Sequence, residues 1–234
     1  MTNGLNGLFA AVFRAIAPTV GQAYAKGDEY ELNKKLDLFE FITFISVYFC
    51  FTLSGLLITP FVQLYTKGVT DANYIQPLFG VLIVLAEGLY LIKEPHVDLS
   101  YTANKFKELA MPAFVEAGIN IMISIILVHK LGLVGVAIGT IAGMTYRMAY
   151  QIYFTTTMVK NRRQWIFYKK LLAFSSVTVV GVAICHFVPL IEVTVWNWIL
   201  HALIYALIFG VLYIILSLLL FKEEILYLKE YLFK

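Results

Sequence analysis

The chain has 234 residues, of which 60% are hydrophobic and 14% are charged. A soluble globular domain has about 45–50% apolar and about 25% charged residues, so this composition excludes an ordinary soluble protein. It indicates an integral membrane protein instead. The net charge of +3 is small, so the distribution of the charges is more informative than their sum.

Apolar runs of the length that an α-helix needs to cross a bilayer, about 20 residues, recur along the chain. They predict an all-α, polytopic helical membrane protein with about seven transmembrane helices. The polar stretches between the runs are too short to form a separate domain, so we expect one membrane-embedded unit over residues 1–234. The predicted spans are residues 3–20, 38–64, 75–93, 110–129, 133–157, 170–190 and 197–220.

Four parts are expected within this unit. Residues 1–157 hold the core helices, and residues 158–169 form a basic cytoplasmic loop. Residues 170–221 form two peripheral helices, and residues 222–234 form an amphipathic cytoplasmic tail.

The basic residues favour one side of the predicted membrane. Of the 18 Lys and Arg residues, two lie inside predicted spans, and only Lys67 and Lys130 lie on the side opposite the other basic residues. Basic loops face the cytoplasm in most membrane proteins, so the N-terminus is predicted outside and the C-terminus inside. We interpret these loops as topology signals and expect no nucleic-acid partner. The residues on the basic side are Lys26, Lys34, Lys35, Lys93, Lys105, Lys107, Lys160, Arg162, Arg163, Lys169, Lys170, Lys222, Lys229 and Lys234.

The hairpin over residues 110–157 carries the most distinctive polar pattern. Glu116, Asn120 and Ser124 follow one another at four-residue spacing, which places them on one face of a helix. The next span carries Tyr146 and Arg147. Charges at membrane depth are costly and mark functional sites or ion pairs. Two interpretations stay open: a Glu116–Arg147 pair that fixes the hairpin, or a polar surface that lines a cavity.

The second helix of this hairpin also carries Gly135, Gly139 and Gly143 at the same spacing. Small residues in such a row allow a neighbouring helix to approach closely. We therefore interpret the row as a packing surface rather than as part of a reactive site.

Two more charged residues fall inside predicted spans. Arg14 precedes Pro18 by four residues, and it either reaches the interface beside a proline that ends the helix or contributes to a cavity. Glu87 lies about 9 Å inside its span. The charged residues at 93–96 are expected to be solvated at the end of that helix.

Facing inward, Arg14, Glu87, Glu116 and Arg147 would line a cavity open to the cytoplasm. Cations suit an anionic headgroup such as a pyrophosphate, and acids suit coupling to protons or sodium ions. Motifs of soluble enzymes are missing: the sequence has no phosphate-binding glycine loop, metal-spaced His/Cys cluster or nucleophile elbow. We expect no catalytic residue, no metal and no cofactor, and the protein is not expected to be an enzyme.

Four stretches give the chain a resemblance to the C-terminal half of Wzx-type polysaccharide flippases. These flippases belong to the superfamily that also holds the lipid II flippases and the multidrug exporters of the MATE type. The stretches are APTVGQAYAKGDEYELNKKLDLFEF, PFVQLYTKG, FVEAGINIMISIILVHKLGLVGVAIGTIAGMTYR and the basic segment before YKKLLAF. The third is the most specific, and the likeness covers residues 3–175.

The resemblance implies a role in moving undecaprenyl-pyrophosphate-linked oligosaccharide repeat units across the bacterial cytoplasmic membrane, for capsular or surface polysaccharide. Substrate binding would fall to Arg14, Arg147, Tyr146, Asn120 and Ser124. Ion coupling, or a counter-charge, would fall to Glu87 and Glu116. The family's transporters have two lobes, so a missing N-terminal lobe is expected in the same or a neighbouring reading frame.

Three alternatives stay open beside this interpretation. The first is part of a MATE-like exporter of drugs or small cations, from the same superfamily. The chain is also compatible with an inactive truncated remnant. A membrane-embedded enzyme such as a polymerase is disfavoured, because the predicted outer loops are too short to carry catalytic residues.

Overall fold

A computed structural model describes residues 2–188 and 192–232, and this part of the chain is 86% helical without β-strands. The ends of the predicted span 170–190 and of the tail 222–234 fall partly outside these described residues. The all-α prediction is confirmed. The helices are α1 (Thr2–Lys26), α2 (Glu29–Tyr65), α3 (Pro77–Ile92), α4 (Glu94–Thr102), α5 (Phe106–Leu131), α6 (Leu133–Met158), α7 (Gln164–Cys185), α8 (Val195–Leu220) and α9 (Lys222–Leu232).

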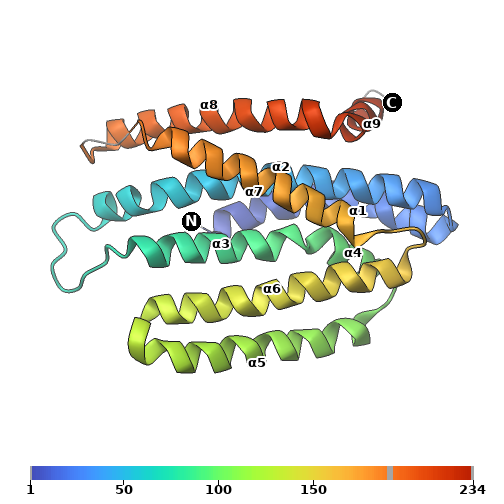
Figure 1. The fold of residues 1–234 in the computed structure, drawn as a ribbon, viewed down its shortest axis with the longest axis horizontal. Coiled ribbons are helices and arrows are strands. Elements are labelled where there is room, and N and C mark those ends of the chain that lie inside the picture. Colours follow the sequence, from blue (N-terminus) through green and yellow to red (C-terminus); the bar gives the residue numbers. More distant parts are fainter. Residues whose placement is uncertain (1, 189–191, 233–234) are drawn as a thin grey trace.

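Helix α2 is the centre of the bundle, because α1, α3, α7 and α8 all pack against it. Most of the long helices run along the long axis of the molecule, while α7 crosses the others obliquely (Figure 1). The α5–α6 hairpin lies at one edge and joins the bundle mainly through α6 and α3. Aromatic residues from α2, α7 and α8 fill the core, among them Phe39, Phe44, Phe174 and Phe209, which are fully buried.

In the described part of the chain, four helices, α2, α5, α7 and α8, are long and apolar enough to cross a membrane. They support a multi-pass membrane protein, but they do not confirm the count of about seven spans. Helix α3 has 16 residues and is therefore about 24 Å long, less than the roughly 30 Å of a bilayer's hydrocarbon core. Helices α1 and α6 contain polar residues that include Arg14 and Arg147.

The helices extend further into the polar stretches than hydropathy predicts. Helix α1 does not end at Pro18 but continues to Lys26, and the chain turns at Gly27, which has φ +70°. Helix α2 starts nine residues before the predicted span. The Asp28 side chain accepts a hydrogen bond from the Glu31 amide at 3.0 Å, which caps the helix. An apolar run marks only the part of a helix that can lie in lipid, whereas the capping residue marks where the helix begins.

The segment after α3 is a second departure from the prediction. The chain enters the short helix α4 at Lys93, and Pro95 lies in its first turn. Lys93 and His96 are buried, with exposed fractions of 4% and 1%. The expectation that residues 93–96 are solvated is therefore wrong for these two side chains. Packing of α4 against α1, α2 and α6 covers them.

Candidate functional site

The α5–α6 hairpin brings Glu116 and Arg147 together. Arg147 Nη1 lies 3.8 Å from Glu116 Oε2, and the arginine side chain is the more deeply buried of the two. Within residues 2–188 and 192–232, Arg147 Nε and Nη1 have no hydrogen-bond partner. The pair therefore balances the charge of Arg147, while two buried nitrogen atoms of the guanidinium, which carry three N–H groups, have no hydrogen-bond partner.

The polar row of α5 packs into the glycine row of α6. A Cβ atom added to Gly143 would lie 2.8 Å from the Glu116 carbonyl oxygen, and one added to Gly139 would lie 2.8 Å from the Asn120 carbonyl oxygen. Ser124 Oγ donates to Asn120 Oδ1 at 3.0 Å. Asn120 and Ser124 are thus half-buried between the two helices. The glycine row is a packing surface, in agreement with the sequence.

A second group of charges surrounds Tyr90 at the end of α3. Lys93 Nζ lies 3.9 Å from the centre of the Tyr90 ring and donates to Glu94 Oε1 at 3.1 Å. The Tyr90 hydroxyl is close enough to Glu87, Glu94 and Glu116 to be influenced by their charges. Glu87 precedes Tyr90 by three residues on α3, so the two side chains share a helix face.

The remaining two residues predicted to bind substrate are Arg14 and Tyr146. Arg14 is exposed on α1, which packs against α2 and α4 rather than against the hairpin. Its guanidinium makes no ion pair with another described residue. Tyr146 is half-buried on α6, and its ring centre lies 6.4 Å from that of Tyr150. The cavity predicted for these side chains stays a prediction.

A buried ionic cluster near the start of α2 was not predicted. Glu40 is completely buried in the first third of α2 and accepts hydrogen bonds from Arg162 Nη2 and, at 2.8 Å, from Lys170 Nζ. Asp37, one turn earlier, accepts from Arg162 Nη1 at 2.8 Å and from Lys170 Nζ at 3.1 Å. Two acids and two bases thus join α2 to the start of α7.

The cluster continues into α4 and α6 through His96. The Nε2 atom of His96 lies 3.0 Å from Glu40 Oε1, although this contact does not have hydrogen-bond geometry. Its Nδ1 atom lies 3.1 Å from Thr155 Oγ1. Gln151 Nε2 donates to the His96 carbonyl oxygen at 3.0 Å and to Ser100 Oγ at 2.7 Å. These contacts hold α4 against α6.

Burial and charge act on this cluster in opposite directions. Burial lowers the pKa of Arg162, but the charges of Glu40 and Asp37 and their hydrogen bonds outweigh it, so the pKa is raised. Glu224, on α9, lies 3.9 Å from Lys170 Nζ. Burial raises the pKa of Glu224, and the charge of Lys170 only partly opposes this shift. Because its pKa is raised, Arg162 stays positively charged in this cluster.

One sequence signal points toward the cluster. Asp37 and Glu40 are spaced one turn apart at the edge of an apolar run, which places them on one helix face. Their partners lie more than 120 residues further along the chain. Arg162 and Lys170 belong to the basic segment that was interpreted only as a topology signal, so nothing local identifies them as buried partners.

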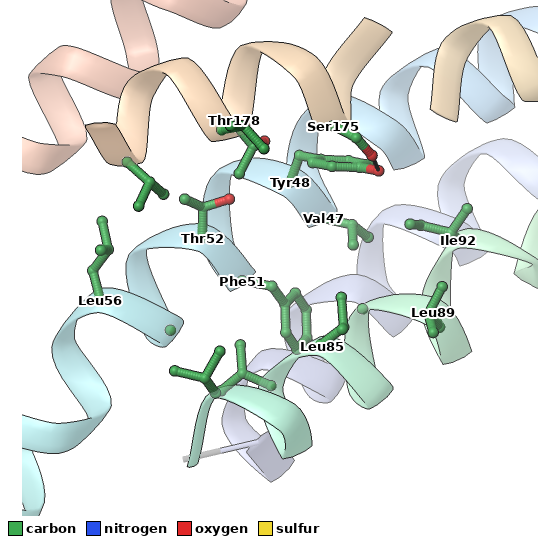
Figure 2. A pocket seen from close by; sticks show the side chains of 16 residues that line it. Val47, Tyr48, Phe51, Thr52, Leu56, Leu85, Leu89, Ile92, Ser175 and Thr178 are labelled. Carbon is green, nitrogen blue, oxygen red and sulfur yellow. Dashed lines mark hydrogen bonds between the residues drawn. The ribbon is translucent and has the colours of Figure 1, made fainter. Parts of the chain in front are cut away.

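A cavity of about 400 Å³ lies between α2, α3 and α7. Figure 2 shows Val47, Phe51, Leu85 and Ile92 along its wall, with Ser175 on α7 across from them. None of the residues predicted to bind substrate lines it. A cavity this size falls in the range of small-molecule sites, which is about 300–1,000 Å³.

The described residues contain no group of three or more His, Cys, Asp or Glu side chains suited to a metal ion. The described residues thus contain three candidate features. They are Arg147, whose Nε and Nη1 atoms lack hydrogen-bond partners, the buried ionic cluster, and the apolar cavity. Comparison with known proteins adds no neighbour, because no family model, curated protein or solved structure matches the chain.

Proposed function

We propose that the chain is the second lobe of a transporter that moves undecaprenyl-pyrophosphate-linked oligosaccharides across the bacterial cytoplasmic membrane. In this proposal all seven long helices cross the membrane, the N-terminus lies outside and the C-terminus is cytoplasmic. The resemblance of residues 3–175 to Wzx-type flippases is the reason for choosing this substrate class. A first lobe, encoded in the same or a neighbouring reading frame, completes the transporter.

The observation that carries the proposal is the state of Arg147. Its side chain is nine-tenths buried, and two of its nitrogen atoms have no hydrogen-bond partner in the described part of the chain. A buried donor without a partner costs about 1–3 kcal/mol, and more when the group is charged. A pyrophosphate oxygen is a suitable acceptor, because arginine binds phosphate groups through paired N–H donors.

Glu116 then has a second role. With no substrate present, Glu116 balances the charge of Arg147 at 3.8 Å. An anionic headgroup at Arg147 displaces this carboxylate, which can then take up a proton or sodium ion. Binding of the lipid headgroup and release of the counter-charge are coupled in this way, and the two lobes rock around the site between them.

The proposal is tested in cells whose native copy is replaced by variants. Arg147→Ala should abolish most surface polysaccharide, with lipid-linked repeat units accumulating in the membrane, while Arg147→Lys should retain part of it. Arg163→Ala removes an exposed arginine outside the site and is the matched control. If Arg147→Ala is made at normal levels and export continues unchanged, the proposed role of Arg147 is wrong.

One observation favours a second candidate, an exporter of organic cations. The exposed Tyr90 ring accepts a cation, Lys93 Nζ, at 3.9 Å from its centre, and Glu87 lies one turn earlier on the same face of α3. Acids beside an aromatic ring suit a cationic ligand. Efflux of cationic dyes that is lost in Glu87→Gln, with polysaccharide export intact, would favour this candidate over the flippase.

A further inference from the structure

The cavity between α2, α3 and α7 has a shape that follows from how these helices pack. Helices α3 and α7 both pack against α2 and leave a cleft between them. Gly55 and Gly88 form part of its wall, where the lack of side chains leaves room. The cavity therefore lies beside the middle of α2, one of the four helices able to cross a membrane.

The mouth of this cleft faces outward. Val81 and Leu85 on α3, and Val179 and Val182 on α7, line the cavity and yet are exposed. Exposed apolar side chains on α7, one of the helices long and apolar enough to cross a membrane, face hydrocarbon rather than water. The cleft therefore opens sideways into the bilayer.

The hydroxyl groups in the cavity wall are already paired with protein groups. Tyr48 OH lies 2.6 Å from Ser175 Oγ, a contact drawn in Figure 2. Tyr213 OH lies 2.7 Å from Thr178 Oγ1 and 3.2 Å from Thr52 Oγ1. A sugar or a cation would find no charge here and only hydroxyl groups that already have hydrogen-bond partners, so burying it would leave most of its own polar groups unsatisfied.

The geometry points to one acyl chain of a bilayer phospholipid as the occupant of this cavity. An uncharged chain is complementary to a wall without charged residues. The volume fits as well: about 400 Å³ holds roughly a dozen methylene-sized groups at about 30 Å³ each, the volume per water molecule in the liquid. This is most of one acyl chain and only a small part of a long polyprenyl chain. The inference rests on the membrane setting of α2 and α7 and not on the proposed transport.

The bound chain fills the space between two groups of helices, α3 with the α5–α6 hairpin and α7 with α8. Because α3 and α7 meet mainly through α2, the chain supplies packing contacts that the protein lacks there. A tightly held lipid is thus an integral part of the bundle.

The test uses phosphatidylglycerol with a diazirine in the middle of one acyl chain, added to membranes that contain the full chain. After photolysis, mass spectrometry of peptides locates the label. We expect label on the residues of α2, α3 and α7 that line the cavity. Gly55→Leu, which fills the cavity, should abolish this labelling, and Gly88→Leu should do the same from the other wall.

Gly118→Leu is the matched control, because it makes the same change at a helical glycine with open space around it. It should leave the cavity labelling intact. The inference is overturned if the filled variants, made at normal levels, are labelled as the control is. It is also overturned if undecaprenyl phosphate at low concentration removes the label, since a polyprenyl chain would then be the occupant. Neither outcome depends on polysaccharide export, so the test is independent of the proposed function.

Discussion

Glu40 and Lys170 are 130 residues apart in the chain, and their side chains meet at 2.8 Å in a site where both are almost completely buried. Arg162 binds the other oxygen of the same carboxylate. A carboxylate between two cations at this depth is stable only if all partners stay in place, because each ion has lost its hydration. The position of α7 against α2 therefore depends on this contact.

Removing the charge of Glu40 should weaken the bundle strongly. Glu40→Gln keeps the shape of the side chain but leaves Arg162 and Lys170 short of one negative charge. Breaking one side of a buried pair costs about 3–5 kcal/mol. We expect a loss of this size in unfolding titrations of the detergent-solubilised protein.

Glu223→Gln is the control, since Glu223 is exposed on the neighbouring helix α9. It should change the free energy of unfolding by less than about 0.5 kcal/mol. Equal stability of the Glu40 and Glu223 variants would show that the buried cluster does not hold α7 in place.

The hydrogen bonds around His96 predict which ring nitrogen carries a proton. Thr155 Oγ1 donates its only proton to the Gln151 carbonyl oxygen at 3.0 Å. It can therefore only accept from His96, so Nδ1 must be the donor at 3.1 Å. Nitrogen-15 NMR of labelled protein should show a protonated Nδ1, and Thr155→Val should remove this signature. A bare Nδ1 in the native protein would contradict the prediction.

The sequence predicts the parts of this fold that depend on local patterns. Each apolar run overlaps one helix, because about 20 apolar residues cannot be solvated and form a helix within the bilayer. The Glu116–Arg147 pair was one of two open interpretations, and it could be foreseen because a short turn at Gly132 brings adjacent helices together.

Contacts between distant segments could not be foreseen in this way. Glu40 selects Arg162 and Lys170 from fourteen basic residues on the predicted cytoplasmic side, and nothing in the spacing distinguishes them. The burial of His96 depends on the docking of α4, a nine-residue helix that a hydropathy pattern does not reveal. Tertiary packing, rather than local composition, decides both features.

The glycine row of α6 predicts a sharp difference between two similar substitutions. A methyl group at Gly139 would lie 2.8 Å from a backbone oxygen and 2.9 Å from a backbone nitrogen of α5, neither of which can move alone. Gly139→Ala should therefore separate the hairpin and cost about 1–3 kcal/mol.

At Gly118, on the exposed side of α5, the same change meets open space. Gly118→Ala should be neutral or stabilise the helix by up to about 1 kcal/mol. Thermal unfolding of the two variants in detergent compares them directly. If both behave alike, the close approach of α5 and α6 is not required for stability.

Asp98 predicts a pH dependence of stability. Burial in α4, together with the charge of Glu94, raises the pKa of this carboxyl from 3.8 to about 6. The folded protein then binds more protons than the unfolded chain between about pH 4 and pH 6. Its stability therefore falls as the pH rises through this range, and the ionised carboxylate destabilises the fold at pH 7.

Asp98→Asn removes this charge without changing the size of the side chain. The variant should unfold at a higher temperature than the native protein at pH 7, and the difference should shrink toward zero near pH 4. Melting curves across this pH range, with Glu223→Gln as a control, measure the effect. A gain that is equally large at pH 4 would show that the substitution acts through packing and not through the titration of Asp98.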